Sequence, residues 1–286
     1  MTPNDASIRR VYASTLKPTA NTGNLGDIFG YLLMEKLGLT TMERIGIPDK
    51  DSIDGQTLIL VGSILNHIRP NQNALVYGPG FITSDDNPNR LKGNRIAGVR
   101  GKLSKKKIEE AFPGTKVRVC SDPGLLMKTV MAPSFEASKE LKVGAIVHSV
   151  DRELYLKSSF NHIPIIEHYK GLERFLTDIQ SYSHVISTSL HGMIFCHSLG
   201  IPVLPVAISN KITGGSFKFR DYLSSVKIRQ KNDLMSLHLA PREESKLIDS
   251  IKSHPQPTAE VIERLIQRQL KMIKRLLTNP PITPSF

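Results

Sequence analysis

The 286-residue sequence has no tryptophan, only two cysteines and 6% aromatic residues. With so few aromatic side chains among its basic ones and no recognisable binding motif, a nucleic-acid-binding module is a poor interpretation. The two cysteines, Cys120 and Cys196, lie on apolar segments of different halves, which favours reduced, packed thiols over a disulfide. No apolar run approaches the roughly 18 residues that cross a bilayer, and the first residues lack the apolar stretch of a signal peptide. These absences predict a cytoplasmic protein.

Known metal and phosphate motifs are also missing. Cysteine and histidine do not cluster at zinc spacing, and Asp85-Asp86 is better interpreted as a turn. Neither a G-x-x-x-x-G-K-[ST] loop nor a dinucleotide fingerprint is present. We therefore expect no metal and no cofactor. The formal net charge of +12 nevertheless predicts attraction to anions, although charge alone does not choose among phosphorylated substrates, acidic lipids and nucleic acid.

Short apolar runs alternate with helical patterns along most of the chain, which is typical of parallel βαβ units. We expect a helix near 27–37 and strands at 57–61, 74–77, 95–99 and 116–120. A linker with a helix at 127–142 then leads to strands at 143–147 and 163–166 and a helix near 172–182. The sequence predicts two Rossmann-like doubly wound α/β domains, residues 1–135 and 136–286, that face each other across a cleft.

The stretch 184–206 predicts a buried strand, a polar elbow, a short helix and a second buried strand. Gly200, followed by Ile201-Pro202, ends the helix. In open α/β sheets, ligands bind outside the carboxyl ends of the strands, where the N–H groups of the next helix favour an anion. The elbow holds Ser187, Thr188, Ser189 and His191, so we expect the chemistry there.

The same elbow resembles a family signature. Ser189-Leu190-His191-Gly192, with Leu-Gly-Ile-Pro downstream, is similar to the Arg/Ser-Leu-His-Gly motif of the polysaccharide pyruvyl transferase family, in particular members like the succinoglycan enzymes. Other segments resemble the family in the same order, at 24–27, 60–63, 76–81, 98–101, 121–126, 210–211 and 214–222. The resemblance covers roughly residues 21–223 and leaves the C-terminal tail uncovered. One departure is Ser189, where many members carry arginine. Either a cation comes from elsewhere, with Arg100, Lys211, Lys218 and Arg220 as candidates, or the anion is held differently.

The resemblance implies transfer of pyruvate from phosphoenolpyruvate to two hydroxyls of a sugar, forming a cyclic ketal. The acceptor would be a polysaccharide or its precursor, with a lipid-linked form left open, and the fold would be similar to that of two-domain (GT-B-like) glycosyltransferases. A glycosyltransferase that uses a nucleotide sugar remains the alternative, because a fold does not fix its chemistry.

The catalytic candidates are His191, for donor binding and proton transfer, and Asp27, as the base or orienting group for the acceptor. Asp27 can equally be a carboxylate favoured by a helix N-terminus. The substrate-binding candidates are Asn24, Gly26, Arg100, His148, Ser187, Thr188, Ser189, Leu190, Lys211 and Lys218. His168 is a further candidate for the cleft, while His197 is expected to pack and Asp122 to form a turn.

Each of two basic segments allows two interpretations. The loop 209–219, with Lys211, Gly214, Gly215 and Lys218, suits a lid over an anionic donor, or is a mobile surface loop. A helix at 258–277 carries an apolar stripe and several Lys and Arg residues. We interpret it as a core-packing helix with a solvated basic face, the alternative being peripheral contact with an acidic membrane on the cytoplasmic side.

Overall fold

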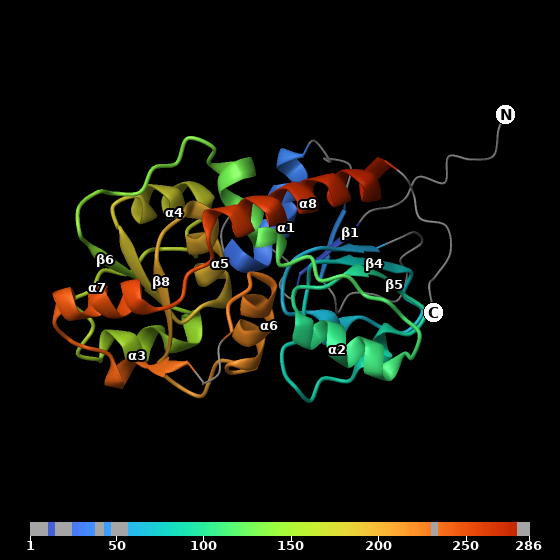
Figure 1. The fold of residues 1–286 in the computed structure, drawn as a ribbon, viewed down its shortest axis with the longest axis horizontal. Helices are drawn as coiled ribbons and strands as arrows, with labels where there is room; N and C mark the ends of the chain where they lie inside the picture. Colours follow the sequence, from blue (N-terminus) through green and yellow to red (C-terminus); the bar gives the residue numbers. More distant parts are fainter. Residues whose placement is uncertain (1–10, 15–24, 38–42, 47–56, 230–233, 279–286) are drawn as a thin grey trace.

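The computed structural model describes residues 11–14, 25–37, 43–46, 57–229 and 234–278. Its strands form two sheets, one with five strands and one with four, and all neighbouring strands in them run parallel. The sheet of the N-terminal half lies on the right in Figure 1 and that of the C-terminal half on the left. The expectation of a mixed α/β protein with parallel sheets is therefore confirmed.

The first sheet has the order β2-β1-β3-β4-β5. Its strands are β1 (Val11–Ser14), β2 (Glu43–Gly46), β3 (Thr57–Ile59), β4 (Ala74–Tyr77) and β5 (Arg95–Gly98). Side chains alternate between its two faces, as the period of two requires. Leu58 and Leu75, which pair in register, face the large apolar cluster that contains helix α1 (Leu25–Lys36). Ile59 and Val76 face a second cluster, so both faces are covered, as is usual for parallel sheets.

The second sheet has the order β6-β7-β8-β9. Its strands are β6 (Val143–Ile146), β7 (His184–Ser187), β8 (Val203–Ala207) and β9 (Met235–Ser236). Ile146 and Val185 belong to the same large cluster as Leu58 and Leu75. Ala145 and Ile186 point to the other face, into a third cluster. One apolar cluster thus spans the space between the two halves.

Among the described residues, seven further α-helices cover the sheets. They are α2 (Lys102–Ala111), α3 (Arg152–Leu156), α4 (Leu172–Ile179), α5 (Leu190–Leu199), α6 (Phe217–Ser225), α7 (Glu244–Ser253) and α8 (Ala259–Thr278). Figure 1 shows α8 running across the top of the molecule from one half to the other. Its Gln269 donates hydrogen bonds to the carbonyl oxygens of Cys120 (2.9 Å) and Asp122 (3.2 Å). The C-terminal helix therefore reaches back to the segment at which the first half ends.

Most expected elements are present, with some corrections. The prediction for 74–77 matches β4, and the long C-terminal helix is confirmed as α8. The strands expected at 116–120 and 163–166 were wrong, since only single bridges form there, Val99 to Val119 and Ala145 to Ile165. Of the linker and helix expected at 127–142, the structure has a short π-helix at Met127–Met131, and Pro133, which cannot donate a backbone hydrogen bond, follows. The two cysteines are free and buried, and burial raises the pKa of both thiols.

Candidate functional site

The polar elbow after β7 is held together by its own hydroxyl groups. Ser187 donates to the carbonyl oxygen of Ser189 (2.9 Å) and accepts from the Ser189 N–H (3.1 Å). Ser189 is the N-cap of α5, where its hydroxyl accepts from the N–H of Gly192 (3.3 Å). The Thr188 hydroxyl accepts from the N–H of His148 at the end of β6 (2.8 Å). All three hydroxyls are buried and shape the elbow, which fixes the start of α5.

His191 lies in the first turn of α5 and is enclosed by three neighbours. Its ring stacks on Phe195, one turn further along, with the ring centroids 5.9 Å apart. Gly26 of α1 approaches so closely that an added Cβ would stand 2.2 Å from His191 Nδ1. On the third side, His191 Nε2 lies 3.7 Å from Asp122 Oδ2. The His191 side chain keeps an exposed fraction of 12%, whereas its Nε2 atom is buried and has no hydrogen-bond partner among the described residues.

Asp122, which the sequence suggested only as a turn residue, has its two carboxylate oxygens in different surroundings. One carboxylate oxygen accepts from the N–H of Gly124 (2.9 Å) and caps the 3₁₀ turn Pro123–Leu126. The other oxygen faces His191 and has no hydrogen-bond partner among the described residues. The Asp122 side chain is fully buried. A carboxylate in this position can orient the imidazole through the attraction of opposite charges.

Two further histidines lie near His191, close enough for the three rings to influence one another electrostatically. His148 follows β6; burial lowers its pKa, and the Lys218 cation lowers it further. His168 is buried, and this burial, followed by the effect of His148, lowers its pKa to about 4. The carbonyl oxygen of His168 accepts from the N–H of Leu25, where α1 begins. The elbow of the second sheet, His148 and the start of α1 are thus brought to one place.

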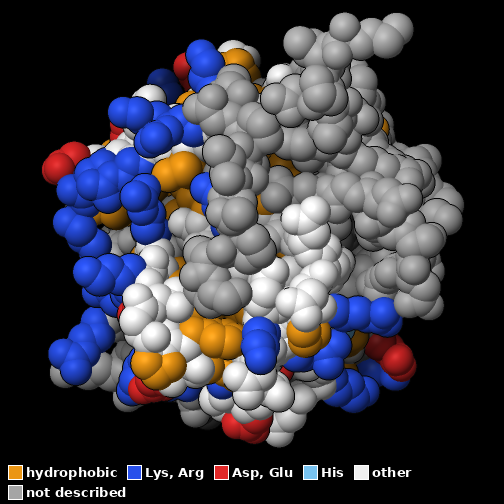
Figure 2. All heavy atoms as spheres, turned by 90° about the vertical axis from the view of Figure 1, so that its right-hand side faces the viewer, with side chains coloured by type: hydrophobic (Ala, Val, Ile, Leu, Met, Phe, Trp, Pro, Cys, Tyr) orange, Lys and Arg blue, Asp and Glu red, His pale blue; other side chains and the backbone are white. Residues whose placement is uncertain are grey.

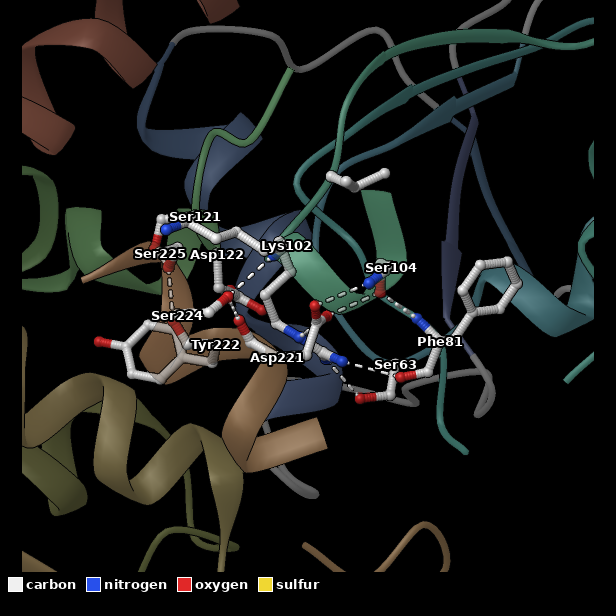
Figure 3. Close-up of polar contacts among 12 residues, drawn as sticks. Ser63, Phe81, Lys102, Ser104, Ser121, Asp122, Asp221, Tyr222, Ser224 and Ser225 are labelled. Carbon is white, nitrogen blue, oxygen red and sulfur yellow. Dashed lines mark hydrogen bonds and ion pairs between the residues drawn. The ribbon is translucent and has the colours of Figure 1, made fainter. Parts of the chain in front are cut away.

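Arg100 was expected to bind an anion, but its guanidinium group is already bound by other groups of the protein. The side chain is fully buried and forms an ion pair with Asp221 of α6 at 3.1 Å. It also donates to the hydroxyl of Ser63 (2.6 Å) and to the carbonyl oxygen of Phe81 (2.8 Å). Asp221 accepts in addition from the hydroxyl (2.7 Å) and the N–H (2.9 Å) of Ser104, as Figure 3 shows. Arg100 therefore joins the first sheet to α6 across 121 positions of sequence.

The remaining sequence candidates are placed as follows. Asn24 lies outside the described residues, as does the side chain of Asp27, whose backbone lies in α1. Leu190 is buried in the large apolar cluster. Lys211 is exposed, with its N–H donating to Ser209 (3.1 Å). Lys218 is half-buried at the start of α6, near His148.

The loop that carries Lys211 borders a hollow of about 610 Å³ at the carboxyl end of β8. Its polar lining is uncharged and includes Ser209, Asn210, Thr213 and Ser216. Ser209 donates a hydrogen bond to Asp151, a buried residue of the turn that follows His148. The hollow is therefore joined by direct contacts to the group of histidines, and its hydroxyl and amide groups suit a neutral polar ligand.

Within the described residues, no three His, Cys, Asp or Glu side chains lie together in a way that could hold a metal ion. No helix of the described part is both long and apolar enough to span a membrane.

Comparisons with known proteins add to this geometry. A family model described as polysaccharide pyruvyl transferase matches residues 42–210, more than half of the chain. An uncharacterized protein of Acanthamoeba polyphaga mimivirus is 30% identical over 170 residues, which are 57% of this chain and 58% of that protein. The chain therefore spans little more than half the length of this relative.

Two solved structures are similar at low scores. A functionally uncharacterized protein from Klebsiella pneumoniae subsp. pneumoniae NTUH-K2044 has a TM-score of 0.41 at 18% identity, covering 76% of this chain and 87% of that one. The wall teichoic acid polymerase TagF has a TM-score of 0.41 at 11% identity, covering 95% and 90%. At these scores neither structure bears on the chemistry. Because the family model matches more than half of its residues, the chain belongs to the polysaccharide pyruvyl transferase family.

Proposed function

We propose that the protein transfers pyruvate from phosphoenolpyruvate to two hydroxyls of a saccharide and forms a cyclic ketal. The observation that carries this proposal is the pair formed by His191 and Asp122, with 3.7 Å between Nε2 and Oδ2, beside the start of α1. Both residues lie within the range 42–210 that the family model matches. A carboxylate behind an imidazole is an arrangement that supports proton transfer.

The reaction needs one proton delivered and one phosphate released. His191 in its protonated form gives a proton to the methylene carbon of the donor while the first sugar hydroxyl attacks the neighbouring carbon. The proton that this hydroxyl loses returns to His191, and the second hydroxyl then displaces phosphate, which takes up the second proton. Asp122 holds the imidazole in position and stabilises its positive charge through both steps.

The negative charges of the donor need cations, and Arg100 is already engaged with Asp221. We assign this task to Lys211, Lys218 and Arg220, which lie in the loop after β8 and the first turn of α6; of these, Lys218 lies near His148. Arg220 Nε is buried and has no hydrogen-bond partner among the described residues, as would suit a group that waits for an anion. Lys218 and Arg220 of α6 would then supply the positive charge that is missing at Ser189.

The acceptor would occupy the hollow beside β8. Its uncharged lining of Ser209, Asn210, Thr213 and Ser216 resembles the hydroxyl and amide groups that bind neutral sugars through hydrogen bonds. At about 610 Å³ the hollow has the size of an ordinary small-molecule site. In this proposal residues 1–135 and 136–286 are two Rossmann-like domains in a GT-B-like arrangement, and the acceptor is a polysaccharide or its precursor on the cytoplasmic side.

The test is calorimetric titration with phosphoenolpyruvate and, separately, with a panel of nucleotide sugars, followed by assay of phosphate release with saccharide acceptors. We expect saturable binding of phosphoenolpyruvate and loss of turnover in His191→Ala. The matched control is His162→Ala, an exposed histidine of the same half. Heat from a nucleotide sugar, with none from phosphoenolpyruvate, would replace the proposal with a glycosyltransferase. Unchanged turnover in His191→Ala would overturn the role of His191.

A further inference from the structure

A second cavity, far along the chain from the signature, lies between α8 and the segment that follows α2. Its volume is about 510 Å³. Four cations line it, namely Arg118 from that segment and Arg268, Lys271 and Arg275 from α8. Its apolar part includes Leu265, which is buried, and Met272, which is half-buried. Two elements distant in sequence thus direct positive charge to one apolar hollow.

The charge of this cavity is not neutralised by the described residues. No Asp or Glu lies among the described residues that line it. All four cations are exposed, and none forms an ion pair within the described part of the chain. Four unpaired cations this close together repel one another, so an anion that binds among them gains affinity.

The helix geometry explains why three of the cations meet. Arg268, Lys271 and Arg275 follow one another at steps of three and four, which places them on one face of α8. The apolar stripe of α8 packs beside them, so the long side chains stand at the border between core and solvent. Figure 2 shows many Lys and Arg side chains gathered along one side of the molecule, with hydrophobic side chains exposed between them.

We propose that this cavity binds the phosphate head group of an anionic membrane lipid. The cations contact the phosphate, while Leu265 and Met272 lie against the first carbons of the lipid chains. A soluble phosphate would use only the cations, whereas a lipid matches the charged border and the apolar base together. This inference does not depend on pyruvyl transfer.

The position of the cavity gives lipid binding a consequence for the rest of the molecule. Cys120 lines it, and Gln269 of α8 holds the carbonyl oxygens of Cys120 and Asp122. A lipid bound here would therefore place the segment that ends in Asp122 close to the membrane surface. An acceptor carried on a lipid would then be within reach of the site.

Co-sedimentation with vesicles tests the proposal. We expect the protein to bind vesicles of phosphatidylcholine that contain phosphatidic acid, and not vesicles of phosphatidylcholine alone. One cation near an anionic surface contributes about fivefold in affinity, so Arg268→Gln and Arg118→Gln should each weaken binding by about fivefold. The matched control is Arg264→Gln, because Arg264 lies one turn before Arg268 on the same face of α8 but does not line the cavity.

Three results would overturn the proposal. Equal losses for Arg264→Gln and Arg268→Gln would show attraction to the whole basic face and not to the cavity. Equal binding to both vesicle types would remove the role of the lipid phosphate. Binding of inorganic diphosphate without binding to vesicles would identify a soluble ligand. Circular dichroism of each variant separates these results from loss of folding, and phosphate-release activity should stay unchanged in all three variants.

Discussion

Asp122 uses one carboxylate oxygen to cap a turn and the other to face His191. Asp122→Asn keeps an oxygen that can accept from the N–H of Gly124 but removes the negative charge beside the imidazole. If Asp122 positions His191, kcat should fall on the order of 100-fold with little change in KM for phosphoenolpyruvate. An unchanged kcat, with normal folding, would leave Asp122 only as a turn residue.

His168 gives the stability of the protein an expected dependence on acid. Burial lowers its pKa to about 4 from the ordinary 6.5, so the folded protein holds it neutral. Below pH 6.5 the unfolded chain takes up a proton that the folded chain does not, and stability is lost as the pH falls toward 4. At pH 5 this loss amounts to about 2 kcal/mol.

His168→Phe removes the titrating group and should reduce the loss between pH 7 and pH 5 by that amount. Urea unfolding of both proteins at the two pH values measures the difference, whatever the change in stability at pH 7. An equal loss of unfolding free energy between pH 7 and pH 5 in wild type and variant would contradict the pKa assigned to His168. His197, whose pKa burial lowers to about 3, remains in both proteins and provides the shared background.

At the scale of single residues, sequence patterns predicted a role for His191 because the family signature lies on it. They predicted Asp122 only as a turn former, since no local pattern shows that its second oxygen would meet a histidine from another half. Arg100 illustrates the opposite case. A strand-end arginine is a good anion ligand on local grounds, but its partner Asp221 lies 121 positions away. Contacts of that range become visible only in the folded chain.

The helix α6 is fixed to the first half through its Asp221. Asp221→Asn leaves the buried Arg100 charge without its carboxylate partner, and breaking a buried pair in this way costs about 3–5 kcal/mol. Urea unfolding should show this loss as a lower midpoint. The control is Asp178→Asn, whose partner Arg174 is bonded through the same atoms at 3.0 Å but is exposed. Asp178→Asn should lower the free energy of unfolding by about 0.5 kcal/mol or less. Equal losses in the two variants would contradict the argument that burial makes the Arg100 pair costly to break.

At the scale of elements, the periodic patterns were enough for β4, α5 and α8, because each has a clear apolar period between turn signals. The errors at 116–120 and 163–166 have a common physical cause. Both segments are apolar and extended, but each makes a single bridge, at Val119 and Ile165. Whether an extended segment joins a sheet depends on which strand edge is available, and that is decided by the tertiary structure.

At the scale of the whole molecule, the apolar cluster that joins the halves bears on how the chain unfolds. Leu58 and Leu75 of the first sheet share this cluster with Ile146 and Val185 of the second. Two polar contacts reinforce the junction, Gln269 to Cys120 and Ser198 to the carbonyl oxygen of Leu125 at 2.7 Å. If one sheet unfolded alone, the apolar side chains that the other sheet contributes to this cluster would lose their packing partners and become exposed to water.

We therefore expect the two sheets to unfold together, even if residues 1–135 and 136–286 are separate domains by topology. Hydrogen exchange at increasing urea concentration, followed by mass spectrometry of peptides, should show β4 and β7 losing protection at the same concentration. Asp221→Asn should lower both transitions equally, because the contact it breaks lies between the halves. Loss of protection in β4 well before β7 would mean that the shared cluster contributes little. The halves would then be independent units, and the distance between His191 and Asp122 would vary with their motion.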